Sequence, residues 1–114
     1  SLCHSWGASP IYLLGKYYLG VKPLTAAYET YVIEPNLGGL KWMQGKVPTP
    51  AGEIDLYVST SQIKVKSPVG TGTLKIKSKT KPSAKGATIK QVAKNTYEMQ
   101  IAKGKEYIVT GIKN

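Results

Sequence analysis

Residues 31–54, YVIEPNLGGLKWMQGKVPTPAGEI, constrain the fold of this chain more than any other stretch. Short apolar runs alternate there with turn-forming sequences: Pro-Asn-Leu-Gly-Gly, a break at Gly45, and Val-Pro-Thr-Pro-Ala-Gly. Because proline lacks an amide donor and its ring clashes with the preceding helical turn, this density of proline and glycine excludes a helix. The stretch therefore predicts short strands joined by turns.

The rest of the chain continues this pattern, with turn signals at intervals near ten residues that are typical of an antiparallel β-sandwich. We predict about eight strands, in residues 31–34, 40–44, 54–59, 63–66, 73–78, 88–93, 96–102 and 106–112. Strict alternation assigns to the core Ile54, Leu56, Val58, Tyr97, Met99 and Ile101. Trp42, on the strand LKWMQ, is also predicted to be a core residue. Residues 79–86, KTKPSAKG, are predicted to form a loop.

The segment before residue 31 has a different character. Ser9 and Pro10 form an N-cap with proline at the first helical position, and the helix IYLLGKYYLG would end at Gly20 in a left-handed conformation. Its apolar residues cover two stripes, so the helix requires packing partners on several faces. Residues 21–30 are predicted to be a connector. We therefore expect a helix and connector in residues 1–29 and a sandwich in residues 30–114.

Length and composition limit the classes of protein that the chain can represent. A chain of 114 residues can bury about 65% of its unfolded surface, enough for one core. The single cysteine, Cys3, cannot form an internal disulfide, and with His4 it offers too few ligands for the usual metal site. No apolar run approaches the ~18 residues of a membrane span. We expect no metal, cofactor or membrane partner, and a start at Ser1 indicates a piece of a longer protein.

The formal net charge of +10 comes from sixteen lysines and no arginine. Twelve of these lysines follow residue 60 and alternate with apolar residues, as in IKVK and LKIKSK. Alternation with period two predicts lysines on the solvent face of a half-buried sheet, where they discourage pairing between sheet edges. No aromatic residue alternates with them to stack on bases, so we expect no nucleic-acid partner. A basic module for acidic polymers remains a less favoured alternative.

The chain carries no recognisable catalytic arrangement. Its six acidic residues do not suggest a pair sharing a cleft, and no serine triad, phosphate loop, dinucleotide fingerprint or metal motif is present. We predict no catalytic residue. One pair suggests binding: the Trp6 indole could stack on a pyranose while the His4 imidazole bonds its hydroxyls. Alternatively, Trp6 is a core anchor and His4 caps the start of the helix.

These motifs resemble the C-terminal end of bacterial α-L-rhamnosidases, glycoside hydrolase family 78. The resemblance covers the first half of the chain and is carried by SLCHSWGASP (1–10), YLL (12–14), LGVKP (19–23), IEPNLG (33–38), LKW (40–42), Gly45 and VPTPAG (47–52). Beyond residue 60 it is limited to PVGT (68–71) and to the approach of Gly104 to Tyr107. Lys22 replaces a common arginine, and Ala26-Ala27-Tyr28 replaces a usual turn at the joint between helix and sandwich.

The resemblance implies that the helix is the last of an (α/α)6 catalytic barrel and that the sandwich follows it. It also implies inverting hydrolysis of terminal α-L-rhamnosides by two glutamates that lie upstream, so this chain alone would be inactive. His4 matches the family histidine of the rhamnose subsite, and Trp6 matches more weakly. The implied partners are the upstream barrel and a rhamnose-containing glycan, and a periplasmic or secreted location is slightly favoured.

The principal alternative is a stand-alone carbohydrate-binding sandwich. Such a module requires solvent-exposed aromatic residues on one sheet face. In the predicted strands, Tyr57 and Tyr107 are the candidates for that role. Titration with oligosaccharides separates this alternative from an accessory domain that supports a catalytic barrel.

Overall fold

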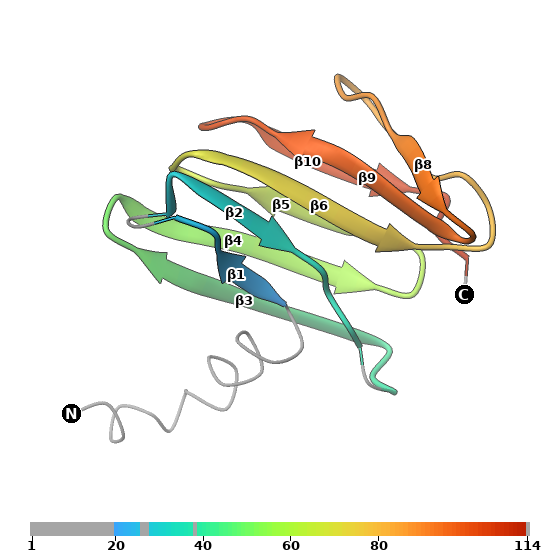
Figure 1. Cartoon of the computed structure of the whole chain (residues 1–114). Coiled ribbons are helices and arrows are strands. Elements are labelled where there is room, and N and C mark those ends of the chain that lie inside the picture. Colours follow the sequence, from blue (N-terminus) through green and yellow to red (C-terminus); the bar gives the residue numbers. More distant parts are fainter. Residues whose placement is uncertain (1–19, 26–27, 38, 114) are drawn as a thin grey trace.

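Two five-stranded β-sheets pack face to face in the computed structural model, which describes residues 20–25, 28–37 and 39–113 (Figure 1). The first sheet has the order β1 (Val21–Pro23), β2 (Thr30–Ile33), β6 (Thr71–Lys77), β9 (Thr96–Ile101), β8 (Lys90–Ala93). The second has the order β3 (Trp42–Thr49), β4 (Gly52–Ser59), β5 (Ile63–Lys66), β10 (Glu106–Thr110), β7 (Ser83–Ala84). The predicted mainly-β sandwich is confirmed.

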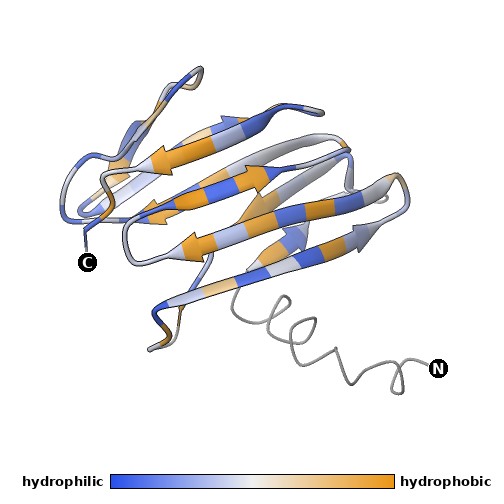
Figure 2. Ribbon diagram, turned by 180° about the vertical axis from the view of Figure 1, so that it is seen from behind, coloured by the Kyte–Doolittle hydropathy of each residue, from blue (hydrophilic) through white to orange (hydrophobic). Residues whose placement is uncertain are grey.

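The core lies between the sheets and is built by alternation along the strands (Figure 2). The residues predicted to face inward do so, and each is less than a tenth exposed: Ile54, Leu56, Val58, Tyr97, Met99 and Ile101. Burying side chains of this size stabilises the fold by about 1.5–3 kcal/mol each. The predicted outward lysines of β5, Lys64 and Lys66, are exposed.

Seven of the eight strand pairs are antiparallel, and the exception joins β2 to β6 in parallel. In this pair Tyr31 is opposite Gly72, and the Tyr31 ring lies where a Cβ on Gly72 would be. Gly72 has no side chain, and the buried Tyr31 ring fills the space that a side chain there would occupy. A large aromatic ring and a glycine form one packing unit in the first sheet.

Ten strands are present in the described residues, where about eight were predicted. β1 lies within the predicted connector, where it pairs with β2, and beside this pair the Glu34 amide donates to the Gly20 carbonyl at 3.0 Å. β7 lies within the predicted loop 79–86 and pairs with β10. Both strands are too short for alternation to reveal them.

The boundaries of β3 also differ from the prediction. The strand was expected to span residues 40–44 and to stop before Gly45, yet β3 continues through Gly45 and Pro48 to Thr49. β3 is an edge strand of the second sheet, so Pro48 needs no amide donor on its free side. Met43 and Val47 are both buried and keep the alternation in phase across Gly45.

The predicted helix of residues 10–19 lies outside the described residues, and the division at residues 29 and 30 stays a prediction. Gly20 has the left-handed conformation expected of it, with φ of 68°. No helix within the described part of the chain has the length and hydropathy that crossing a membrane would require.

The Tyr31 hydroxyl is buried and has no hydrogen-bond partner among the described residues. Burial raises the pKa of Tyr31 above the ordinary value of 10.0; the nearby Ser67 hydroxyl lowers it in part, and Tyr107 raises it further. Ser67 Oγ donates instead to the Val69 carbonyl at 3.0 Å. The ring of Tyr31 therefore contributes packing, while its hydroxyl costs desolvation.

Replacing Tyr31 with phenylalanine is expected to leave stability unchanged at pH 7 or to raise it by about 1 kcal/mol, because a buried unsatisfied hydroxyl is removed. Above pH 10 the unfolded phenol ionises before the folded one, so the wild type loses stability as pH rises towards the raised pKa. The advantage of the variant should therefore grow above pH 10. Urea unfolding at pH 7 and at alkaline pH measures both effects, and a clear loss of stability at pH 7 would show that the hydroxyl is satisfied.

Candidate site on the outer face of the second sheet

Trp42 lies on the solvent face of β3 and is 58% exposed. The prediction that it is a core residue is wrong. Alternation along β3 places Met43 and Val47 inside, so Trp42, one residue before Met43, must face outward. Leu40 lies two residues before Trp42 and Met43 directly after it, so the short run LKWMQ does not reveal which face of the strand carries the ring.

The Trp42 indole stacks with the Tyr57 ring at a centroid distance of 6.2 Å and an interplanar angle of 23°. Trp42 is opposite Ser59 and Tyr57 is opposite Gln44, so the two rings are diagonal neighbours on adjacent strands. The Lys64 ammonium lies 5.8 Å from the centre of the Tyr57 ring. We call the pair Trp42 and Tyr57 the aromatic platform.

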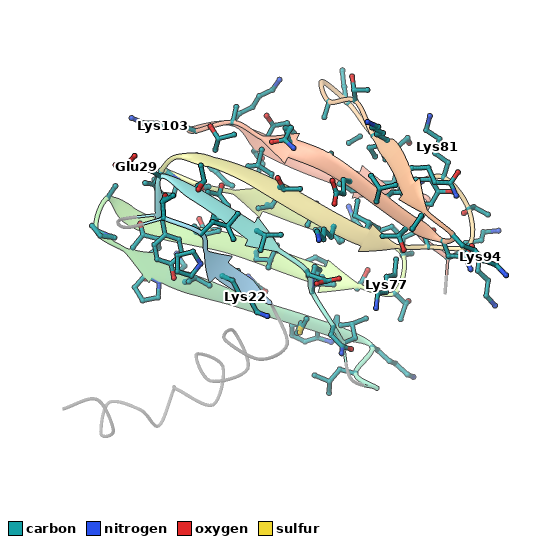
Figure 3. The ribbon with its side chains drawn as sticks, viewed as in Figure 1. Lys22, Glu29, Lys77, Lys81, Lys94 and Lys103 are labelled. Carbon is teal, nitrogen blue, oxygen red and sulfur yellow. The ribbon has the colours of Figure 1, made fainter. Side chains whose placement is uncertain are left out.

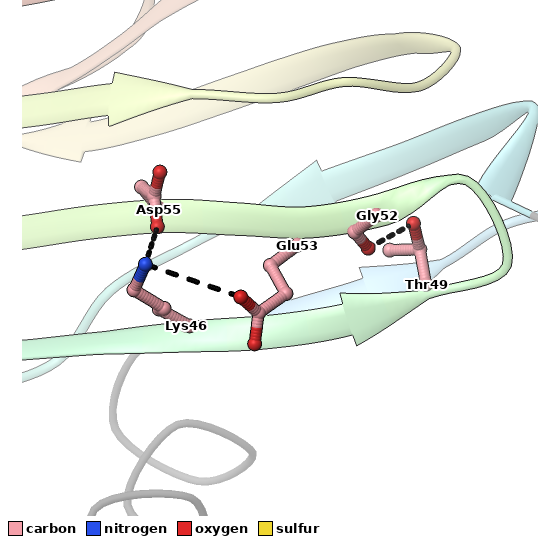
Figure 4. Close-up of polar contacts among 5 residues, drawn as sticks. All are labelled: Lys46, Thr49, Gly52, Glu53 and Asp55. Carbon is pink, nitrogen blue, oxygen red and sulfur yellow. Dashed lines mark hydrogen bonds and ion pairs between the residues drawn. The ribbon is translucent and has the colours of Figure 1, made fainter.

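A row of alternating charge crosses four strands beside the platform. Each residue of the row is the register partner of the next: Lys46 on β3, Asp55 on β4, Lys66 on β5 and Glu106 on β10. The Lys46 ammonium lies 3.4 Å from Asp55 and 3.9 Å from Glu53 (Figure 4). With Lys64, three lysines and three carboxylates share this face, so its formal charge is balanced within a chain of net charge +10.

The carboxylates of this face do not form an acid–base pair. Glu53 and Asp55 share the Lys46 ammonium, and their side chains are 56% and 52% exposed. General acid–base chemistry needs two carboxyl groups that face a reacting bond from separate positions, whereas these two lie together on one exposed surface around the Lys46 ammonium. Among the described residues no group of three potential metal ligands occurs. The geometry suits binding rather than bond cleavage.

The platform and the charged row line a shallow hollow of about 770 Å³, within the usual range of ligand sites. Its lining comes from four strands and comprises Trp42, Gln44, Gly45, Lys46, Glu53, Asp55, Leu56, Tyr57, Lys64, Val65, Lys66 and Glu106.

The remaining lysines lie mainly elsewhere. Lys77, Lys81 and Lys94 lie towards one end of the sandwich (Figure 3). The β6 end and the β8–β9 turn meet there, because the Ser78 amide donates to the Asn95 carbonyl at 2.9 Å. The expectation of no nucleic-acid partner stays a prediction. Binding to acidic polymers stays a less favoured alternative.

The other sequence-predicted binding residues fall in two groups. His4 and Trp6 lie outside the described residues, so the structure does not place them. Of the two tyrosines expected to be exposed, Tyr107 is buried at 4% exposure, and its hydroxyl accepts a hydrogen bond from the Ala102 amide at 3.0 Å. Tyr57 does face outward, with Trp42 as its neighbour. Along β3, Met43 and Val47 face inward and Pro48 faces outward. This alternation is the sequence signal that could have predicted an outward-facing Trp42.

The fold is a β-sandwich domain of two five-stranded sheets. The crystal structure of Streptomyces avermitilis α-L-rhamnosidase complexed with L-rhamnose is similar, with a TM-score of 0.73 at 14% sequence identity. The match covers 86% of this chain and 10% of that one, so this chain spans about a tenth of its length. No curated protein sequence matched.

The family model of the bacterial α-L-rhamnosidase C-terminal domain matches residues 20–88. The matched region includes β1 to β7 and the whole of the aromatic platform. The chain belongs to this family.

Proposed function

We propose that this chain is the C-terminal accessory sandwich of an enzyme that hydrolyses terminal α-L-rhamnosides, and that a catalytic domain precedes it in the same polypeptide. The observation that carries the proposal is the family match over residues 20–88. The fold of the similar rhamnosidase supports it.

In this proposal the sandwich covers and stabilises the last helix of an (α/α)6 barrel, and residues 1–29 comprise that helix and the connector to the sandwich. His4 contributes an imidazole to the rhamnose subsite, with Trp6 beside it. The proposal for His4 is supported by the resemblance of the segment SLCHSWGASP to the family motif. An imidazole offers one donor and one acceptor, which suits the paired hydroxyls of a sugar.

Replacing His4 with alanine in the longer protein is expected to lower kcat/KM for an aryl α-L-rhamnoside about tenfold, because one or two hydrogen bonds to the sugar are lost. The neighbouring Ser5→Ala variant is the matched control and should keep the wild-type rate. The 114-residue chain alone should show no turnover. Activity of the isolated chain, or a His4→Ala enzyme with unchanged kcat/KM, would contradict the corresponding part of the proposal.

A further inference from the structure

We propose that the aromatic platform of Trp42 and Tyr57 is a binding subsite for a neutral oligosaccharide of pyranose units. This site goes beyond the accessory role and does not depend on His4. It lies on the outer face of the second sheet, on residues of two adjacent strands, β3 and β4.

The exposure of Trp42 is the first argument. A strand residue with a large apolar ring normally faces the core, yet this indole is 58% exposed on the opposite face. Its ring plane lies 23° from that of Tyr57 at a centroid distance of 6.2 Å, so the two rings form one aromatic cluster rather than two isolated side chains. The apolar C–H face of a pyranose covers such a surface, while the ring hydroxyls remain free to hydrogen-bond at its margin.

The polar groups around the platform provide the second argument. Gln44 is opposite Tyr57 on β3, and its amide offers both a donor and an acceptor. Lys64 is opposite Tyr57 on β5, and Asp55 lies two residues before Tyr57 on the same face of β4. A polyhydroxylated ring requires this combination: aromatic rings on which it stacks, and amide, ammonium and carboxylate groups at their margin.

The charge of the face selects a neutral ligand over an acidic one. Three lysines are balanced by three carboxylates, two of which share the Lys46 ammonium at 3.4 and 3.9 Å. An acidic polymer would meet Glu53, Asp55 and Glu106 as well as the lysines, so it gains little net attraction here. The lysines at the end of the sandwich, Lys77, Lys81 and Lys94, would attract it more strongly.

Nuclear magnetic resonance of the ¹⁵N-labelled 114-residue chain tests the proposal directly. The chain contains two tryptophans, Trp6 and Trp42, so two indole N–H signals are expected, and the Trp42→Phe variant assigns them. The probes are neutral tetrasaccharides of glucose, mannose and rhamnose, with a tetragalacturonate as the charged comparison. We expect at least one neutral probe to shift the Trp42 signal saturably, with little change between low and high salt.

Trp42→Ala should weaken binding about tenfold or more, whereas Trp42→Phe should retain most of it because a ring is kept. Val92→Ala, which truncates another exposed apolar residue on β8, is the matched control and should bind as the wild type does. Thermal unfolding of each variant checks that the sandwich is intact. Because Trp42 is exposed, its truncation should shift the melting temperature little.

The proposal is overturned if no neutral probe shifts the Trp42 signal. It is also overturned if tetragalacturonate binds there more tightly, or if Trp42→Ala leaves sugar binding unchanged. A Trp42 signal unmoved by sugars, together with a Trp42→Ala variant that loosens the attachment of the upstream domain, would identify the platform as a protein contact instead. A shift of the Trp6 signal alone would overturn this site and leave the proposed role of His4 standing.

Discussion

Replacing Gly72 with alanine is expected to destabilise the sandwich by about 3 kcal/mol or more, although alanine normally stabilises a strand interior relative to glycine. The added Cβ would occupy the space of the Tyr31 ring, whose nearest atoms lie well inside van der Waals contact. Tyr31 is 1% exposed, so the ring cannot swing into solvent without opening the core. Urea-induced unfolding followed by circular dichroism measures the loss.

Two controls separate this clash from a general intolerance of β6. Thr71→Ala changes an exposed position on the same strand and should cost less than about 0.5 kcal/mol. In a Tyr31→Ala background the Gly72→Ala change should cost little, because the ring that it meets is gone. Equal destabilisation in both backgrounds would show that the ring and the glycine are not coupled.

Replacing Gly20 with alanine is expected to cost about 2–4 kcal/mol, through backbone strain and a steric clash together. Gly20 has φ of 68°, and a Cβ there would meet the Glu34 carbonyl, which is backbone and cannot rotate away. The hydrogen bond from the Glu34 amide to the Gly20 carbonyl, 3.0 Å long, would be lost in the readjustment. Thermal unfolding of the 114-residue chain should show a lower melting temperature.

Gly39→Ala is the matched control for this change. Gly39 also has a positive φ, of 96°, but nothing lies within 4 Å of an added Cβ. The Gly39→Ala variant should therefore lose only about 1 kcal/mol of stability, from backbone strain without a steric clash. If the Gly20 and Gly39 variants are equally stable, the close approach of residues 20 and 34 does not anchor β1.

The sequence was sufficient to predict the sandwich because its strong signals are local. Alternation in β4 and β9 was enough to predict which side chains face inward. The turn between β8 and β9 is also a local feature, because Asn95 there has φ of 55° and asparagine tolerates the left-handed backbone. The parallel pairing of β2 with β6 was not predictable in this way. It joins Thr30 to Thr71 across forty-one positions, and no local pattern encodes such a distant partner.

The candidate site was missed for a related reason. A tryptophan between Leu40 and Met43 reads as core when the strand is taken to stop before Gly45. Only the full length of β3, through Val47 and Pro48, fixes the phase that turns Trp42 outward. The stacking of Trp42 on Tyr57 depends further on the register of β3 with β4, which places the rings diagonally.

The parallel β2–β6 pair also sets an order of assembly. As the chain emerges from the ribosome, β1 and β2 form a hairpin that lacks a neighbour until β6 has been synthesised some forty residues later. A two-stranded hairpin is marginally stable by itself, so we expect these two strands to join the first sheet only once β6 is available. Because β1 is joined to the first sheet only through β2, loss of the β2–β6 pairing would release both strands together.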